Sequence, residues 1–254
     1  NISYYVDAYG NILATKGVSN YYPMVCCHTD TVHDFEKGFK VIKENDCFLA
    51  FNSQLEQCGV GGDDKVGVWA ALNLLLDNDI IDLKVGFFVE EEIGCLGSSN
   101  IDKNFMIDVS YMIQTDRMGN DDFITGHLGS NISIELFDIW ENYISSFGYK
   151  VREQYSVTDC MTISDMYGIS AVNISSGYYR PHTYTEIVNI KDAKNALALM
   201  RELILQTPYN IKYEIEFYND YNYVDDYSEM SIINNDPTCC KLCDSQLIKD
   251  EWYD

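Results

Sequence analysis

Short apolar runs alternate along this chain with longer stretches in which apolar residues recur every three or four positions. The short runs predict buried strands, and the longer stretches predict amphipathic helices. The ranges predicted as strands are 21–27, 83–89, 104–114 and 171–175, and those predicted as helices are 64–76, 136–147 and 191–206. Because strands alternate with helices, we expect an α/β domain with a mostly parallel central sheet flanked by helices.

Hairpins and an irregular tail complete the pattern. Residues 3–15 and 39–51 each hold two β-rich runs around a turn, and residues 123–134 are β-like but broken by glycine. Beyond them the regular pattern ends in a sequence rich in Tyr, Asp and Asn. We therefore expect one domain over residues 1–207 and an acidic extension over 208–254, which begins with an edge strand and then becomes irregular.

The charge of the chain is strongly negative. Its 40 acidic residues outnumber its 17 lysines and arginines, which gives a formal net charge of −23. Nucleic acids and anionic membranes both require basic surfaces, so we expect neither as a partner. No apolar run reaches the ~18 residues that would span a bilayer. An acidic surface attracts cations instead.

Nine cysteines lie along the chain without the regular spacing of a disulfide framework. Because there is also no signal-peptide pattern, we expect free thiols and a cytoplasmic location. Cys240 and Cys243 form one Cys-x-x-Cys pair, which is half of a zinc ribbon. No partner pair follows, so we expect disordered thiols there rather than a structural zinc.

Histidines and acidic residues occur at the ends of successive predicted strands. The residues that follow strands are His28, Glu91, Glu92, Asp116 and His182, and a sixth, Asp63, opens a helix. Ligands of open parallel sheets gather beyond the carboxyl ends of the strands. We therefore expect these six side chains to lie close together.

Imidazoles and carboxylates are ligands that zinc accepts. Two histidines and three or four carboxylates are more than one tetrahedral ion can bind. Two ions that share a carboxylate would use the whole set, and such ions lie about 3.5–4 Å apart. The pattern predicts a site for two Zn²⁺ ions, and Co²⁺ or Mn²⁺ would fit the same ligands. For the adjacent acids Asp63 and Asp64, the alternative is an acidic cap on the helix that follows.

Five segments resemble, in order and type, the signature of the co-catalytic zinc exopeptidases and amidohydrolases. This group is peptidase clan MH, which includes peptidase T, the glutamate carboxypeptidases and the desuccinylases. The segments are His28-Thr29-Asp30-Thr31-Val32, Gly62-Asp63-Asp64-Lys65-Val66-Gly67, Glu91-Glu92-Ile93-Gly94, Asp116 and Tyr178-Tyr179-Arg180-Pro181-His182-Thr183. The resemblance covers residues 22–206 and implies a phosphorylase/hydrolase-like fold, with residues 1–207 as the di-zinc catalytic domain.

The resemblance also implies a ligand set. Asp63 would bridge the two zinc ions, of which one is also held by His28 and Asp116. The second ion would be held by Glu92 and His182.

Further roles follow from the same resemblance. Glu91 would be the general base for a hydroxide that bridges the metals and attacks an amide carbonyl. Asp30 would hydrogen-bond His28 and fix its tautomer. Asp64 would cap the helix rather than bind metal.

One departure from the family pattern concerns oligomerisation. Peptidase T and its close relatives carry a lid or dimerisation domain between the fourth and fifth ligands, whereas here only residues 117–181 separate Asp116 from His182. The layout is similar to that of the single-domain aminopeptidases of the clan. We therefore expect no inserted lid domain and no lid-mediated dimer, and the oligomeric state stays open.

Four other residues have two interpretations each, and for a fifth we favour one. Arg180 and Arg117 would either clamp a substrate carboxylate or neutralise nearby acids. His127 would stabilise an oxyanion or be an ordinary loop histidine. His33 would line the site or lie on the surface, and we expect Lys65 to compensate the acidic pair beside it.

The function we expect is that of an exopeptidase, either an aminopeptidase or a di- or tripeptidase, with a small peptide as substrate. An amidohydrolase that removes acyl groups from N-acyl amino acids, as desuccinylases do, is the alternative enzyme. A third candidate is a non-catalytic metal-binding or interaction protein on the same scaffold. The presence of Glu91 beside His28 and His182 favours catalysis, because a protein without catalysis needs no base beside its ligands.

Overall fold

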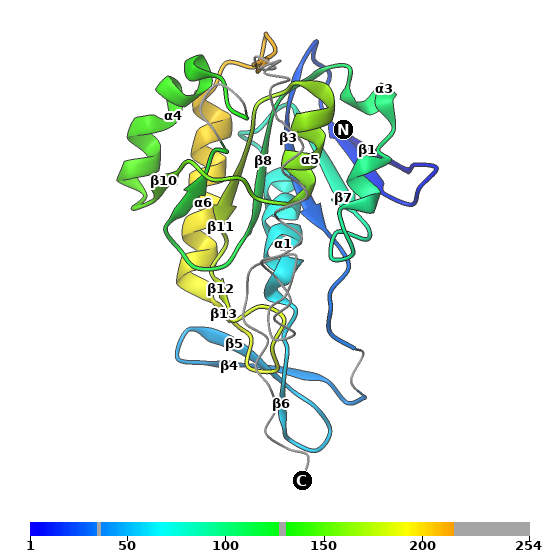
Figure 1. Ribbon diagram of the computed structural model, residues 1–254, viewed down its shortest axis with the longest axis vertical. Helices are drawn as coiled ribbons and strands as arrows, with labels where there is room; N and C mark the ends of the chain where they lie inside the picture. The colour runs from blue at the N-terminus through cyan, green and yellow to red at the C-terminus, as the bar shows by residue number, and fades with distance from the viewer. Residues whose placement is uncertain (35–36, 127–130, 216–254) are drawn as a thin grey trace, which may run out of the picture. The chain divides into compact units, whose positions relative to one another are not determined.

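A mixed eight-stranded sheet forms the centre of the protein in a computed structural model that describes residues 1–34, 37–126 and 131–215 (Figure 1). Its strand order is β1-β2-β7-β3-β8-β11-β9-β10. The four central strands run parallel to one another. They are β7 (Leu83–Phe88), β3 (Tyr22–His28), β8 (Val109–Arg117) and β11 (Ala171–Ser175).

The two edges of this sheet contain antiparallel pairs. The hairpin of β1 (Ile2–Val6) and β2 (Ile12–Lys16) pairs with β7 at one edge. At the other edge, β9 (Asp122–Ile124) runs antiparallel to β11 and parallel to β10 (Lys150–Arg152).

Helices cover both faces of the sheet (Figure 1). One face packs against α1 (Gly62–Leu76), α4 (Ile134–Ser146) and α6 (Ile190–Gln206), and the other against α3 (Lys103–Met106) and α5 (Asp159–Tyr167), with α2 (Leu96–Ser99) beside α5. Strand β3 shows why both faces of the sheet must be covered. Successive side chains point to opposite faces, so Val25 and Cys27 join one core while Met24 and Cys26 join the other. A strand that is covered on both faces is apolar throughout.

The core on the α1, α4 and α6 side contains the large side chain of Trp140, which is fully buried. Its ring meets that of Tyr111 edge to face at a centroid distance of 5.3 Å. Its indole N–H donates to Thr207 Oγ1 at 2.6 Å, so the polar atom of this buried residue has a partner.

A second, smaller sheet joins segments that are distant in the sequence. Its strand order is β12-β13-β5-β4, and β6 (Gln57–Cys58) pairs with β5. The hairpin of β4 (Lys40–Glu44) and β5 (Cys47–Phe51) follows His28 in the chain, whereas β12 (Tyr178–Tyr179) and β13 (Ile187–Asn189) flank His182. Pairing of β13 with β5 therefore brings the His182 loop to the loop that precedes α1.

Gly62 shows how closely these loops approach. A Cβ atom at this position would lie 2.5 Å from Val188 Cγ2 on β13 and 2.9 Å from Tyr178 Cβ on β12. Only glycine leaves room for this contact.

Most of the predicted elements are confirmed, and so is the fold class. The sheet is flanked by helices, and the described parts of residues 117–181 belong to this domain, with no inserted lid domain among them. Five of the described cysteines, Cys26, Cys27, Cys47, Cys95 and Cys160, are free thiols, as expected. No helix in the described ranges is both long and apolar enough to cross a membrane.

Three predictions of secondary structure need correction. Residues 104–106, predicted as the start of a strand, are helical, because the Asp102 side chain accepts the N–H of Asn104 and caps a short helix before β8 begins. Among its described residues, the β-like segment 123–134 contains the end of β9 and a bridge at Ile132, and its last residue begins α4. Helix α5 was not predicted.

The expected extension falls mostly outside the described residues, as do Cys240 and Cys243. Within the described part, Tyr213 is buried against the main core, and Glu214 forms an isolated bridge with Ile169. The edge strand expected there is otherwise untested.

Candidate metal centre

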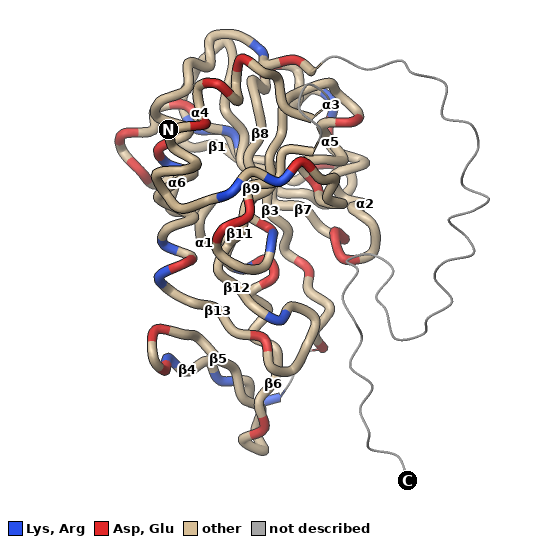
Figure 2. The backbone as a smooth tube through the Cα atoms, turned by 60° about the vertical axis from the view of Figure 1, so that its left-hand side comes forward, with Lys and Arg blue, Asp and Glu red and all other residues tan. Residues whose placement is uncertain are grey.

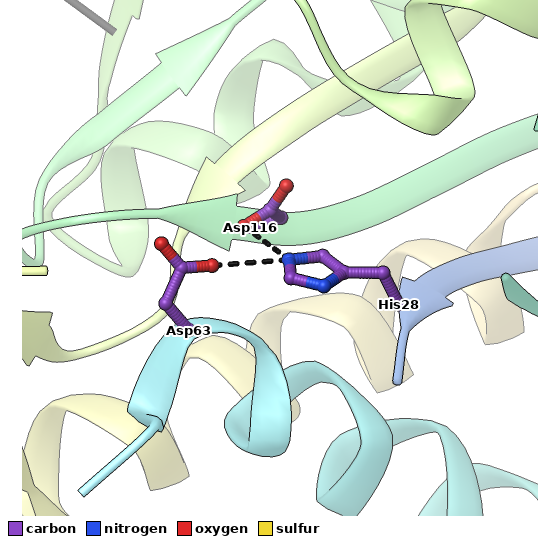
Figure 3. A group of neighbouring side chains, drawn as sticks. All are labelled: His28, Asp63 and Asp116. Atoms are coloured by element: carbon purple, nitrogen blue, oxygen red, sulfur yellow. Dashed lines mark hydrogen bonds and ion pairs between the residues drawn. The ribbon is translucent and has the colours of Figure 1, made fainter. Parts of the chain in front are cut away.

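Three separate elements deliver His28, Asp63 and Asp116 to one point (Figure 3). His28 ends β3, Asp63 lies in the first turn of α1, and Asp116 lies near the carboxyl end of β8. Nε2 of His28 is 3.0 Å from Oδ1 of Asp63 and 3.6 Å from Oδ1 of Asp116. All three side chains are buried.

A second group shares Asp63 with the first. Oδ2 of Asp63 lies 3.2 Å from Nε2 of His182, which is also 3.1 Å from Oε2 of Glu92. Within each group, one atom from each residue lies within 4.8 Å of the others. The two carboxylate oxygens of Asp63 therefore face two different imidazoles, one in each group.

Asp30 contacts the site on the side away from these ligand atoms. Its Oδ1 is 3.4 Å from Nδ1 of His28, and its backbone oxygen is 3.1 Å from the same nitrogen. Its carboxylate also accepts the backbone N–H groups of Glu91 and Glu92, each at 3.1 Å. One carboxylate thus orients the His28 ring and the turn that carries both glutamates.

Side chains that the sequence analysis did not single out hold Asp116. Tyr178 donates its hydroxyl hydrogen to Oδ1 at 3.1 Å, and Gln114 donates to Oδ2 at 3.2 Å. Asn173 on the adjacent strand β11 bonds both backbone groups of Asp116. Gln114 lies two positions before Asp116 on β8, where strand alternation places both on one face. Tyr178 and Asn173 reach Asp116 from other strands, which no periodicity in the sequence reveals.

Asp64 points away from the ligand groups. Its Oδ1 accepts the N–H of Gly67 at 2.8 Å, which confirms a helix-capping contact, and its Oδ2 accepts the N–H of His28 at 3.3 Å. A Cβ atom on Gly67 would lie 2.2 Å from the Asp64 carboxylate, so glycine is needed beside this cap.

We expect Asp64→Ala to lower the free energy of unfolding by about 0.5–2 kcal/mol, because the cap is lost. Metal binding should persist, since the ligand atoms of Asp63 are unaffected. Urea denaturation and metal analysis of the purified variant check both parts. Full stability in the variant would show that the Gly67 contact does not cap the helix.

Acidic residues are spread along the described parts of the chain (Figure 2). The site itself is crowded with buried carboxylates. Burial alone would lower the pKa of His28, but Asp116 and Asp63 raise it well above its usual range. Hydrogen bonds with Asp63 and Glu92 raise the pKa of His182 to about 11. Both imidazoles therefore respond to a strong local excess of negative charge.

Two buried acids, Asp116 and Glu91, have raised pKa values as well, and for a carboxyl group this favours the neutral form. Burial and the nearby charge of Asp63 raise the pKa of Asp116 to about 7. Burial and the charge of Asp116 raise the pKa of Glu91 to about 9. These carboxylates are difficult to ionise together unless positive charge is supplied.

The donor set fits divalent cations on three grounds. Its ligand atoms are imidazole nitrogens and carboxylate oxygens, which suit zinc, cobalt or manganese. Its excess negative charge would be compensated by cations. Oε1 of Glu92 is buried and has no hydrogen-bond partner in the described part of the chain, so it is available to a metal ion.

Glu91 lies beside the first group. Its Oε2 is 4.0 Å from Nε2 of His28, and its Oε1 is 3.5 Å from the thiol of Cys95. The side chain is largely buried and faces the ligands without belonging to either group.

The three basic candidates, Arg180, Arg117 and Lys65, make different contacts. Arg180 is exposed and forms no ion pair with a described residue, whereas Arg117 pairs with Asp122 rather than with the acids of the site. Lys65 forms no direct ion pair with Asp63 or Asp64, although the charges of Glu186 and Asp63 act on its ammonium group as expected for a compensating lysine. It donates instead to backbone oxygens of Val60 and Gly61, because its ammonium group folds back over the loop.

His33 and His127 are the two other histidines that the sequence offered as candidates. His33 neither lies free on the surface nor joins the ligands, since its Nε2 lies 2.9 Å from Oε2 of Glu186. His127 lies outside the described residues.

Comparisons with known proteins find similarity in structure alone. No protein-family profile matches the chain, and no curated protein matches it in sequence. Among solved structures, it is similar to the aminopeptidase PepT from Bacillus cereus, with a TM-score of 0.65, 13% identity and coverage of 81% of this chain and 88% of that one.

Two further structures resemble the chain. A tripeptidase from Staphylococcus aureus gives a TM-score of 0.65 at 14% identity and covers 81% of this chain and 88% of that one. An aminopeptidase from the archaeon Desulfurococcus kamchatkensis gives 0.59 at 15% identity, with 82% and 86% covered. At these identities the likeness establishes a shared fold.

Proposed function

We propose that this protein is a two-metal hydrolase of peptide bonds that acts as an exopeptidase on small peptides. The observation that carries the proposal is the placement of Asp63, whose two oxygens lie 3.0 and 3.2 Å from the imidazoles of His28 and His182. A fold shared with aminopeptidases and a tripeptidase supports the same reaction class.

The ligands would divide as the two groups do. His28 and Asp116 would hold one ion, Glu92 and His182 the other, and Asp63 both. Bound zinc lowers the pKa of water towards about 7 and polarises a carbonyl oxygen. The catalytic domain would comprise residues 1–207 with the described start of the extension packed against it.

Glu91 would act as the general base. Its Oε2 faces the ligand cluster and would accept a proton from the attacking water, while the water oxygen bonds to the carbonyl carbon. The same oxygen would then give that proton to the amide nitrogen as the C–N bond breaks. Asp30 supports this step, because it holds the backbone N–H of Glu91 and orients His28 at the same time.

Arg180 would bind a carboxylate of the substrate. It lies two residues before His182, and its guanidinium forms no ion pair in the described part of the chain. A free guanidinium beside an otherwise acidic site offers a forked pair of hydrogen bonds to a carboxylate.

We expect metal-dependent release of single residues or short units from unblocked di- and tripeptides, measured by chromatography of the products. Chelation should abolish turnover, and zinc, cobalt or manganese should restore it. Preferential cleavage of N-acyl amino acids would favour the deacylase instead. No turnover of either class by the metal-loaded protein would leave a metal-binding protein without catalysis.

A further inference from the structure

Glu186 is a fully buried carboxylate that belongs to neither ligand group. It lies four residues after His182, in the loop between β12 and β13. Its Oε2 accepts the N–H of Gly61 at 2.6 Å, and its Oε1 accepts the N–H of Asp63 at 3.0 Å. Nε2 of His33 contacts Oε2 at 2.9 Å.

We propose that Glu186 is a positioning residue that fixes the orientation of Asp63 relative to both histidines of the metal centre. The proposal rests on the proposed function, because it concerns how the same site is assembled. Asp63 can serve both ligand groups only if its carboxylate stays between His28 and His182.

The start of α1 explains why an outside carboxylate is needed. The first N–H groups of a helix have no partner within the helix. Gly61, which precedes α1, has no side chain to accept them, and the Asp64 carboxylate accepts only the later N–H of Gly67 within the helix. Glu186 supplies the missing acceptors from another loop, and its negative charge also suits the positive end of the helix.

The contacts of Glu186 join three segments that carry ligands. His33 lies five residues after His28, and Gly61 and Asp63 form the loop before α1. Glu186 itself shares a turn with the His182 loop, where its N–H donates to the oxygen of Thr183 at 3.2 Å. One buried carboxylate therefore links the backbones near His28, Asp63 and His182.

His33 is held in place for this contact. A Cβ atom on Gly59 would lie 2.1 Å from the His33 ring, so the ring packs directly on the backbone of the glycine loop. Its nitrogen contacts Glu186 from there.

Glu186→Gln provides the sharpest test. Glutamine has one acceptor oxygen and one NH₂ group, so it cannot accept both backbone N–H groups with separate oxygens. We expect a fall of about 10–100-fold in zinc affinity, as is usual when a group that orients metal ligands is lost. The affinity is measured by competition with a chromophoric chelator, and the visible spectrum of the cobalt-loaded variant should change because Asp63 is displaced.

Two controls separate positioning from general stability. Glu135→Gln makes the same exchange on the surface of α4, and Trp140→Phe loosens the core at a residue that belongs to neither ligand group. Both should keep the parent zinc affinity and cobalt spectrum. An unchanged affinity and spectrum in Glu186→Gln would overturn the proposal.

If Glu186→Gln does not fold, a second variant, His33→Phe, tests the same proposal. His33→Phe keeps a ring against Gly59 and removes only the contact with Glu186. A weaker zinc affinity in His33→Phe supports the proposal, and the parent affinity overturns it. If the parent protein itself binds no zinc, cobalt or manganese, the proposed function fails rather than the role of Glu186.

Discussion

Asp63→Ala is expected to empty both metal positions and to abolish hydrolysis. Each oxygen of Asp63 faces the imidazole of a different ligand group, so its removal takes one ligand from each ion and leaves the remaining acids without their shared partner. The loss of affinity should exceed the roughly 10–100-fold effect of residues that only orient ligands. Elemental analysis after dialysis and titration calorimetry with zinc measure the result.

Asp64→Ala is the matched control, because it changes the adjacent carboxylate, which bonds Gly67 and the backbone of His28 rather than the ligand groups. It should keep both ions. If Asp64→Ala lost its metals while Asp63→Ala retained them, the assignment of the bridging acid would be wrong by one residue.

Glu91→Gln is expected to keep both ions and to lower kcat by about 10²–10⁴-fold, the usual contribution of a general base. The side chain faces the ligands without joining either group, so the amide should leave the ligand atoms in place. Steady-state kinetics on an unblocked peptide, with metal content measured on the same sample, separates lost chemistry from lost metal.

The neighbouring Glu90→Gln provides the control for Glu91. Glu90 is exposed and accepts a hydrogen bond from Tyr9 at 2.6 Å, away from the ligand groups. Its variant should retain the parent kcat. Parent activity in metal-loaded Glu91→Gln would remove the general base from the mechanism.

The ligand cluster could be predicted because its members are placed by local patterns. His28 and Asp116 lie at the carboxyl ends of β3 and β8, and apolar runs in the sequence predict both strands. Parallel strands bring such ends to one edge of the sheet. The predicted neighbours therefore lie together, while their roles as metal ligands stay predictions.

The residues that surround the ligands could not be predicted in the same way. Glu186 reaches Asp63 from a loop 123 positions away, and Tyr178 reaches Asp116 from 62 positions away. Such contacts depend on the packing of the second sheet, which leaves no periodic trace. The backbone oxygens that accept the hydrogen bonds of Lys65 could not be predicted either, although the charge of Asp63 acts on its ammonium group.

Helix α5 was missed because its pattern is weak. It has only nine residues, and its buried positions include the polar Asp159 and Ser164. Burial of these two residues is decided by the sheet on which the helix packs. Sequence periodicity alone would place them on a solvent face.

Anomalous scattering at the zinc edge, from crystals of the protein grown with zinc, tests the central claim most directly. The account predicts two peaks, one among His28, Asp63 and Asp116 and the other among Asp63, Glu92 and His182, about 3.5–4 Å apart. A single peak, or peaks that do not both contact Asp63, would contradict it.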